Sequence, residues 1–264
     1  MNSFEALVLG LIQGLTEFIP ISSSGHLVIA QTFFSGASDH LFLEWINVGT
    51  VLALLVFFRV RIRDAVVRIV VGRDYRLARN VVVAMVPAGL VGFLFSHQIE
   101  NTAFFGSVWT VVVMLVVVGI LLVLLEKLPK QSRIETAEAL PARRALTIGV
   151  AQMFALIPGT SRSGATIIAG RLSGLNRADA AEFSFLVSIP IMLGVLLKLV
   201  VSSGGREYFA ANASALVLGN LAALVSGLLA VGFLMKFLEK NSLAVFGWYR
   251  IGLAVVITLV LLVQ

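Results

Sequence analysis

The sequence predicts an all-α integral membrane protein with six transmembrane helices and two re-entrant helical hairpins, arranged as an inverted-topology repeat. Composition is the first reason. Of the 264 residues, 59% are hydrophobic and 13% are charged, and the mean hydropathy is +1.00. Soluble proteins carry about 25% charged residues, so we expect a polytopic membrane protein. Sequence symmetry and the spacing of the apolar segments are the other two reasons.

An internal repeat provides the symmetry. Residues 13–30 align without gaps on residues 152–169 at a shift of 139 positions, with Gln, Ser-x-Ser-Gly and Ile-Ala in common. Three apolar spans separate the copies, so the copies enter the membrane from opposite faces, an arrangement whose sites lie near the midplane. The chain, residues 1–264, is then one membrane domain, with repeat one over about 1–126 and repeat two over about 144–264.

The first copy begins with a helix that is short for a membrane crossing. Residues 4–19 are apolar and helical in pattern, but a hydrocarbon core of about 30 Å requires about 20 residues. Pro20 disfavours helix at Ile19. Three serines at 22–24 are candidate N-caps for a half-helix that runs to about Phe34.

The second copy repeats this pattern with a helix over 144–157, a break at 158–159 and a half-helix over 163–172. Helix, break and half-helix together predict a hairpin that enters and leaves the membrane on one face. Other segments are apolar and long enough to cross it. These six spans are residues 41–58, 80–97, 104–126, 182–201, 216–238 and 245–263.

The basic residues predict the orientation. Seven arginines lie within residues 59–79, so we expect this loop on the cytoplasmic side. Alternation then places both termini outside, and the first hairpin enters from outside while the second enters from the cytoplasm. We expect Trp109, Trp248 and Tyr249 to mark the membrane interfaces, and Arg250 to snorkel towards one of them.

Charge and cysteine content exclude other classes. A net charge of +6 is compatible with nucleic-acid binding, but most of the basic residues lie in short loops between apolar spans, where they act as topology signals. The chain contains no cysteine, which excludes disulfides and thiolate metal sites. Because no basic segment precedes the first apolar run, we predict no removable signal peptide.

Glu17 is the first candidate for a functional residue. A carboxylate at the centre of a membrane helix costs about 2.5–3.5 kcal/mol on insertion scales, so it favours a function; the alternatives are an interfacial position or a packing ion pair. Ser23 and His26 lie three positions apart at a helix start and can share a face. This spacing suits a nucleophile and its general base, although a hydrogen-bonded packing role for His26 is the alternative.

Arg162 is the candidate anion ligand of the second copy. It lies in Pro-Gly-Thr-Ser-Arg-Ser-Gly-Ala-Thr at 158–166, where glycines permit close backbone approach and a half-helix turns free N–H groups towards an anion. A guanidinium there fits a phosphate; the alternative is an ordinary topology residue. The other expected phosphate ligands or helix caps are Ser22, Ser24, Gly25, Ser161, Ser163, Gly164 and Thr166.

This motif, together with Gln-Gly-Leu-Thr-Glu-Phe-Ile-Pro-Ile-Ser-Ser-Ser-Gly-His at 13–26, resembles the undecaprenyl pyrophosphate phosphatase family that confers bacitracin resistance. The resemblance covers essentially the whole chain, including Glu-Phe-Ser-Phe-Leu at 182–186 and Trp-Tyr-Arg at 248–250. It implies that the family's Glu/Gln-x-x-x-Glu element falls on Gln13 and Glu17. Its nucleophile falls on Ser23, its histidine on His26, and its arginine motif on Ser161, Arg162, Ser163 and Thr166.

The activity implied is hydrolysis of undecaprenyl pyrophosphate to undecaprenyl phosphate and inorganic phosphate, which recycles the lipid carrier for cell-wall synthesis. We expect Ser23 to attack phosphorus, His26 to accept its proton, Arg162 and the half-helix N-termini to stabilise the transition state, and Glu17 to hold a cation or orient His26. Water attack with His26 as base is the alternative.

A divalent cation, Mg²⁺ or Ca²⁺, is expected because the evident ligands are hard oxygens. Many family members have Glu where this chain has Gln13, so only Glu17 remains as an acidic ligand from this element, although the Gln13 amide oxygen can still coordinate.

Two other protein classes share features with this sequence. A transporter of the lipid head group is the first alternative, because inverted repeats with broken helices are typical of transporters. The acid phosphatase-like lipid phosphatases are the other, and they do not fit because Ile168 stands where their nucleophilic His is required. The expected partners are the polyprenyl pyrophosphate and membrane lipid of the plasma (inner) membrane, with a homodimer left open and no nucleic acid.

Overall fold

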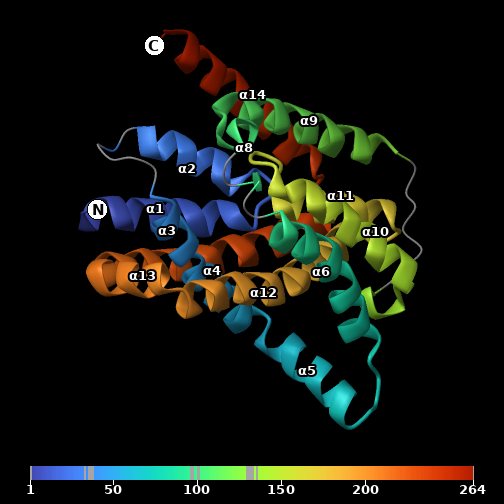
Figure 1. The fold of residues 1–264 in the computed structure, drawn as a ribbon. Helices are drawn as coiled ribbons and strands as arrows, with labels where there is room; N and C mark the ends of the chain where they lie inside the picture. Colours follow the sequence, from blue (N-terminus) through green and yellow to red (C-terminus); the bar gives the residue numbers. More distant parts are fainter. Residues whose placement is uncertain are drawn as a thin grey trace.

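The structure is a computed structural model that describes residues 2–32, 34, 39–95, 98–99, 102–128, 134 and 136–263. These residues form helices and loops, and they include one isolated bridge, between Ile134 and Leu175 (Figure 1). The first half contains α1 (Ser3–Glu17), α2 (Ser23–Thr32), α3 (His40–Trp45), α4 (Asn47–Phe57), α5 (Arg59–Val70), α6 (Arg76–Leu94), α8 (Ala103–Gly106) and α9 (Val108–Lys127). The second contains η1 (Ala137–Ala139), α10 (Ala142–Met153), η2 (Phe154–Leu156), α11 (Arg162–Leu172), α12 (Arg177–Val201), α13 (Ser203–Lys240) and α14 (Ala244–Val263).

The predicted all-α class and the number of spans are confirmed. Within the described ranges, six helical stretches are long and apolar enough to cross a membrane: His40–Phe57, Arg76–Leu94, Val108–Lys127, Arg177–Val201, Ser203–Lys240 and Ala244–Val263. α13 begins well before the predicted residue 216 and bends at Asn212, where φ is −122° and ψ is 19°. The predicted end of the second span, residue 97, lies outside the described residues.

The two predicted helix breaks share one backbone geometry. Ser22 and Ser161 both adopt a left-handed φ, of 74° and 70°, which residues other than glycine rarely do. Each hydroxyl accepts a hydrogen bond from a backbone N–H three residues later, that of Gly25 at 3.3 Å and that of Gly164 at 3.2 Å. These four residues are equivalent in the repeat, so the sequence symmetry is matched by the same local structure.

Each hairpin packs on a helix from the other half of the chain. A Cβ added to Gly10 on α1 would lie 2.2 Å from the carbonyl oxygen of Gly219 on α13. At the equivalent position of α10, a Cβ on Gly149 would lie 2.5 Å from the carbonyl oxygen of Ala84 on α6. Small residues of this kind let helix backbones approach closely in membranes. The hairpins lie on opposite sides of the molecule, and their tips meet in its middle (Figure 1).

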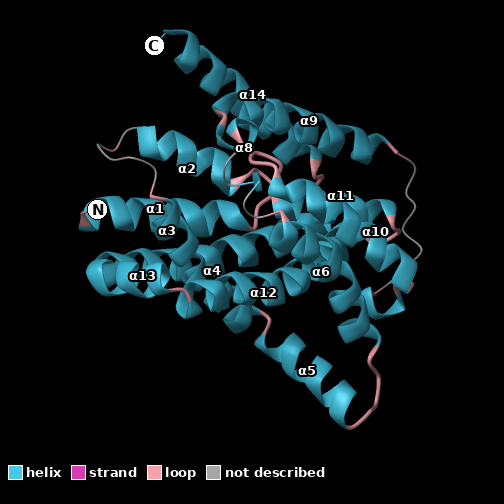
Figure 2. Ribbon diagram, in the orientation of Figure 1, coloured by secondary structure: helices cyan, strands magenta, loops and turns pink. Residues whose placement is uncertain are grey.

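Loops therefore gather inside the helical body, beside α8 and α11 (Figure 2). In a bilayer, such backbone is tolerated only where protein buries it or where it lines a cavity. The first tip is held in the core by Phe18, which is buried and packs edge-on against Phe185 of α12 with ring centroids 5.6 Å apart. The helical body thus shields the breaks from lipid.

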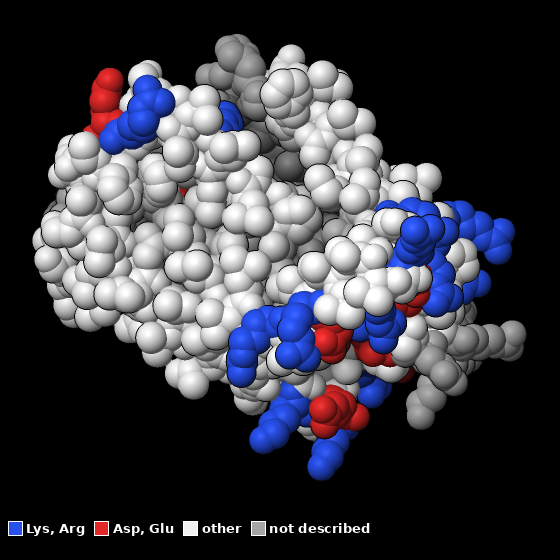
Figure 3. Space-filling model, turned by 90° about the horizontal axis from the view of Figure 1, so that it is seen from below, with Lys and Arg blue, Asp and Glu red and all other residues white. Residues whose placement is uncertain are grey.

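Lys and Arg side chains gather mainly at one end of the molecule (Figure 3). α5, which buries none of its residues, belongs to this end. Arg61 ties α5 to the body through ion pairs with Glu138 at 2.8 Å and Glu182 at 2.7 Å. Burial, the largest single influence, raises the pKa of Glu138, but the hydrogen bonds it accepts and the charges of Arg61 and Arg68 together leave that pKa below its usual value. The uneven charge is the pattern that the positive-inside rule describes.

The close packing of α1 on α13 makes a prediction about stability. Gly10→Ala is expected to lower the free energy of unfolding by about 1–3 kcal/mol, because the added methyl group meets backbone atoms rather than a mobile side chain. Thermal unfolding of purified protein in detergent measures this. Gly89→Ala on α6 is the matched control, since nothing lies within 4 Å of a Cβ at that position. Equal midpoints for the two variants would contradict the packing.

Candidate active site

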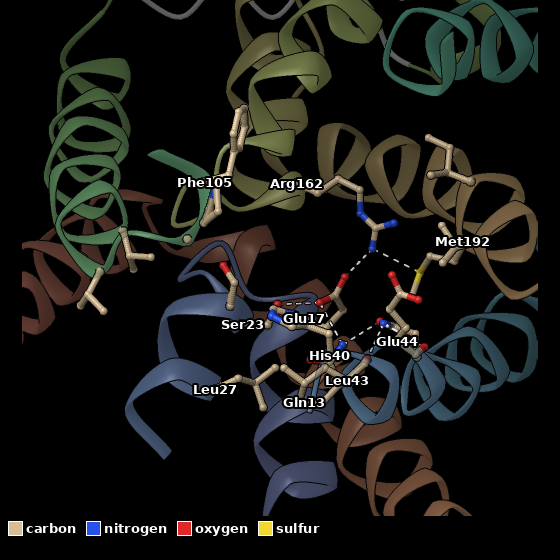
Figure 4. A pocket seen from close by; sticks show the side chains of 18 of the residues that line it. Gln13, Glu17, Ser23, Leu27, His40, Leu43, Glu44, Phe105, Arg162 and Met192 are labelled. Atoms are coloured by element: carbon tan, nitrogen blue, oxygen red, sulfur yellow. Dashed lines mark hydrogen bonds and ion pairs between the residues drawn. The ribbon is translucent and has the colours of Figure 1, made fainter. Parts of the chain in front are cut away.

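A cavity of about 740 Å³ lies where the two hairpin tips meet α3, α4, α9 and α12. The tips contribute polar side chains, and the long helices contribute mainly apolar ones (Figure 4). A concave apolar space with a few converging polar groups is typical of a ligand site. Its polar lining consists of Gln13, Glu17, Ser23, Ser24, His40, Glu44, Asn47, Ser107 and Arg162.

Glu17 and Arg162 form an ion pair that links the two tips. Nη2 of Arg162 lies 2.5 Å from Oε1 of Glu17, and the two side chains are 18% and 13% exposed. Glu17 is the last residue of α1 and Arg162 is the first of α11, so each side chain leaves a helix end and enters the space between the tips. The acid at the end of α1 and the cation at the start of α11 thus lie together.

The second oxygen of Glu17 accepts two more hydrogen bonds. Oγ of Ser23 donates at 2.7 Å and Nε2 of Gln13 donates at 3.1 Å. The Gln13 amide, which is buried, also donates to Oδ1 of Asn47 at 2.8 Å. A neutral Gln13 therefore steadies Glu17 where a second carboxylate would repel it, and the Ser23 hydroxyl lies directly beside a carboxylate.

Both half-helices begin at residues that line the cavity, α2 at Ser23 and α11 at Arg162. The N-terminus of a helix carries partial positive charge and free N–H groups, which favour anions. Nη2 of Arg162 also lies 3.2 Å from Sδ of Met192, which sets the guanidinium against α12. The site therefore combines the Arg162 cation with two helix N-termini around the Glu17 carboxylate.

Most of the predicted phosphate ligands build the tips instead of lining the cavity. Ser24 does line it, and its Oγ accepts a hydrogen bond from the N–H of Gly159 at 3.2 Å, which joins the two tips. Thr166 is buried and shares a hydrogen bond with the hydroxyl of Ser184 at 2.6 Å. The predicted residues that lie outside the cavity lining are Ser22, Gly25, His26, Ser161, Ser163, Gly164 and Thr166.

His26 does not pair with Ser23. Nδ1 of His26 lies 2.7 Å from the carbonyl oxygen of Ser22, and Nε2 lies 2.7 Å from the hydroxyl of Tyr249. Because Nδ1 faces a carbonyl, it carries the proton, and Nε2 accepts from Tyr249. The Ser23 hydroxyl instead reaches back across the break to Glu17, so the side chains of Ser23 and His26 have different partners despite their helical spacing.

The expectation that Arg250 snorkels is wrong. Its side chain is 0% exposed, and its hydrogen bonds go to main-chain carbonyls of both breaks and of α9. Tyr249 beside it contacts the first tip, and it is exposed, as are Trp109 and Trp248. The sequence does contain a signal for the burial of Arg250, because an arginine within the apolar segment 245–263 is a charge at membrane depth and needs a partner.

Glu44 and His40 on α3 are cavity residues that the sequence analysis missed (Figure 4). Asp39 caps this short helix by accepting a hydrogen bond from the N–H of Phe42 at 3.0 Å. The sequence signal that could have identified Glu44 is a carboxylate within an apolar span, as for Glu17. The cavity thus contains two carboxylates from different helices, those of Glu17 and Glu44.

Comparison with known proteins adds to this geometry. The family model described as "Bacitracin resistance protein BacA" matches residues 6–256. "Undecaprenyl-diphosphatase 2" of Shewanella oneidensis is 38% identical over 263 residues, which cover 96% of each chain. "Undecaprenyl-diphosphatase" of Rubrobacter xylanophilus is 41% identical over 278 residues, 99% of each chain. A protein of the same name from Neisseria meningitidis serogroup C is 41% identical over 263 residues, 96% of this chain and 94% of that one. The chain belongs to the bacitracin resistance protein BacA family.

Proposed function

We propose that the protein is an undecaprenyl-diphosphatase, which hydrolyses undecaprenyl pyrophosphate to undecaprenyl phosphate and inorganic phosphate and so recycles the lipid carrier for cell-wall polymer synthesis. The observation that carries this proposal is the meeting of Arg162, Glu17 and Ser23 in one cavity, from two helix tips. The names of the relatives support it. They lend no support to the rival transporter.

Arg162 is the group that holds the terminal phosphate. Its guanidinium now pairs with one carboxylate oxygen of Glu17, and a phosphate presents the same kind of acceptor in larger number. Guanidinium binds phosphate oxygens in a bidentate manner. When the phosphate replaces Glu17 on Arg162, the Glu17 carboxylate leaves its ion pair and keeps the hydrogen bond from the Ser23 hydroxyl.

This exchange prepares Glu17 as the base for Ser23. The hydroxyl already donates to Oε2 of Glu17 at 2.7 Å, within the reach that proton transfer requires. The Ser23 oxygen forms a bond to the terminal phosphorus, the bridging P–O bond breaks, undecaprenyl phosphate leaves, and the proton passes to Glu17. Water then displaces the Ser23 oxygen from phosphorus, and the proton returns from Glu17 to Ser23. The role expected for His26 thus passes to Glu17, because His26 binds Tyr249.

A divalent cation fits this cavity as a partner of the substrate. Glu17 and Glu44 provide carboxylate oxygens, and Gln13 and Asn47 are amides of the same lining. No group of three or more acidic, histidine or cysteine ligands gathers within the described residues. Mg²⁺ suits such a site, because it commonly takes one or two carboxylates and completes its shell with water and substrate phosphates. The cation would neutralise charge on the pyrophosphate.

The arrangement of the hairpins supports a membrane-midplane site. We propose that both hairpins are re-entrant and enter from opposite faces, with the basic end in the cytoplasm and the termini outside the plasma (inner) membrane. The meeting of the tips within the helical body (Figure 1) and the one-sided charge (Figure 3) support this orientation.

Phosphate release from undecaprenyl pyrophosphate by purified protein in detergent tests the function, with and without EDTA. Glu17→Gln keeps the side chain's volume but removes the base, so kcat is expected to fall by about 10²- to 10⁴-fold. Glu207→Gln, an exposed carboxylate on α13, is the matched control and should keep wild-type turnover. Absence of phosphate release by the wild type would reject the function, and activity of Glu17→Gln within about tenfold of wild type would reject only its role.

Arg162→Lys separates a phosphate clamp from a simple positive charge. A lysine keeps the charge but offers a rotatable point charge in place of a planar fork, so kcat/KM is expected to fall by at least about tenfold, nearly as far as in Arg162→Ala. Steady-state kinetics at matched membrane expression measure this, with Arg206→Lys as the control for an exposed arginine. Wild-type kcat/KM in Arg162→Lys would remove Arg162 from the phosphate site.

Single-cysteine labelling tests the orientation, since the chain has no cysteine of its own. A cysteine at Ser202, between α12 and α13, should react with an impermeant maleimide in intact cells. A cysteine at Asp74, between α5 and α6, should react only after the membrane is opened. The opposite pattern would invert the proposed topology.

A further inference from the structure

Arg250 is a fully buried ionisable residue that has no role in the proposed mechanism. It lies on α14, its side chain is 0% exposed, and it is the largest of the fully buried side chains. Its guanidinium donates to main-chain oxygens of Pro20 at 3.3 Å, Gly159 at 2.5 Å, Thr160 at 3.2 Å, Met114 at 3.1 Å and Leu115 at 3.4 Å. One side chain therefore contacts the first break, the second break and α9.

These carbonyls explain why a buried charge is present at all. Burying a guanidinium is costly unless its donors are hydrogen-bonded. The carbonyls of a helix break lack regular helical partners, and leaving such groups unpaired away from water is also costly. The planar fork of arginine reaches carbonyls of both breaks and of α9 from three separate nitrogens, whereas the three donors of a lysine all leave one nitrogen. Arg250 and the two breaks thus stabilise one another.

The contacts of Arg250 lie next to the reacting groups in the chain. Pro20 precedes Ser23 by three residues, and Gly159 and Thr160 directly precede Ser161 and Arg162. The second tip is also pressed on α9, because a Cβ on Gly159, whose φ is +89°, would lie 2.6 Å from the carbonyl oxygen of Val111. A shift of either break therefore moves Ser23 relative to Arg162.

We infer that Arg250 is a positioning residue for the reaction, which holds the two hairpin tips in the register that brings Ser23 and Glu17 of one tip to Arg162 of the other. This inference rests on the proposed function for its kinetic consequence. The hydrogen bonds of Arg250 described above all go to main-chain oxygens, so it acts through the backbone of both breaks. Tyr249, the preceding residue, holds His26 of the first tip from the same helix.

Pulsed EPR on the purified protein tests the positioning directly. Spin labels go on cysteines at Leu15 of α1 and Phe154 of η2, both exposed and each near one tip, in a chain free of other cysteines. Arg250→Gln is expected to broaden or shift the distance distribution between the labels. Arg171→Gln is the matched control, since Arg171 also donates to a backbone carbonyl, that of Leu175 at 2.7 Å, but away from the tips. It should leave the distribution unchanged.

Kinetics of the unlabelled variants provide the second readout. Arg250→Gln is expected to lower kcat by at least about tenfold with KM changed by less than about threefold, because misplaced groups weaken the transition state more than substrate binding. Arg250→Lys keeps the charge but cannot span both breaks, so its kcat should fall between those of wild type and Arg250→Gln. It also serves as the test variant if Arg250→Gln does not accumulate in folded form.

The outcomes separate this inference from the proposed function. A wild-type distance distribution in Arg250→Gln overturns the positioning role, and so does a wild-type kcat alongside a changed distribution. A variant that loses only thermal stability, with kcat and distances of the wild type, makes Arg250 a packing residue and also overturns it. Failure of the wild type to release phosphate rejects the function instead, and the EPR comparison still tests the positioning.

Discussion

Two helix breaks inside an apolar body leave backbone groups that lipid cannot satisfy, and the rest of the structure depends on how those groups are paired. The hydroxyls of Ser22 and Ser161 accept hydrogen bonds from the N–H groups of Gly25 and Gly164. Arg250 donates hydrogen bonds to carbonyl oxygens of both breaks. With these partners, non-helical backbone becomes tolerable in the middle of the molecule, and two half-helices can begin there.

The same breaks concentrate the chemistry of the cavity. A helix end carries partial charge, and here the end of α1 provides Glu17 while the start of α11 provides Arg162. Their ion pair keeps the apolar surroundings free of an unpaired charge. In the proposed reaction, a phosphate replaces the carboxylate on Arg162. The Glu17–Arg162 ion pair is then the resting state of the site, and Glu17 as the base for Ser23 is its reacting state.

Reciprocal packing places the two tips opposite each other. Gly10 seats α1 on α13, and Gly149 seats α10 on α6, so each half of the chain holds the hairpin of the other half. Neither tip has a complete site alone, because one provides the acid and hydroxyl and the other provides the cation. Assembly of the site therefore follows from assembly of the whole body.

The sequence by itself determined the class, the six spans, the two breaks and the residues Glu17 and Arg162, because composition, proline and charge in an apolar setting act locally. Tertiary structure alone decided which side chains meet. Ser23 and His26 share a helical spacing, yet Ser23 turns to Glu17 while His26 turns to Tyr249. Arg250 lies in an apolar span, where snorkelling and burial fit the sequence equally well, and only the carbonyls of breaks far away in the chain select burial. Partners of this kind are set by packing between distant segments, which no local pattern encodes.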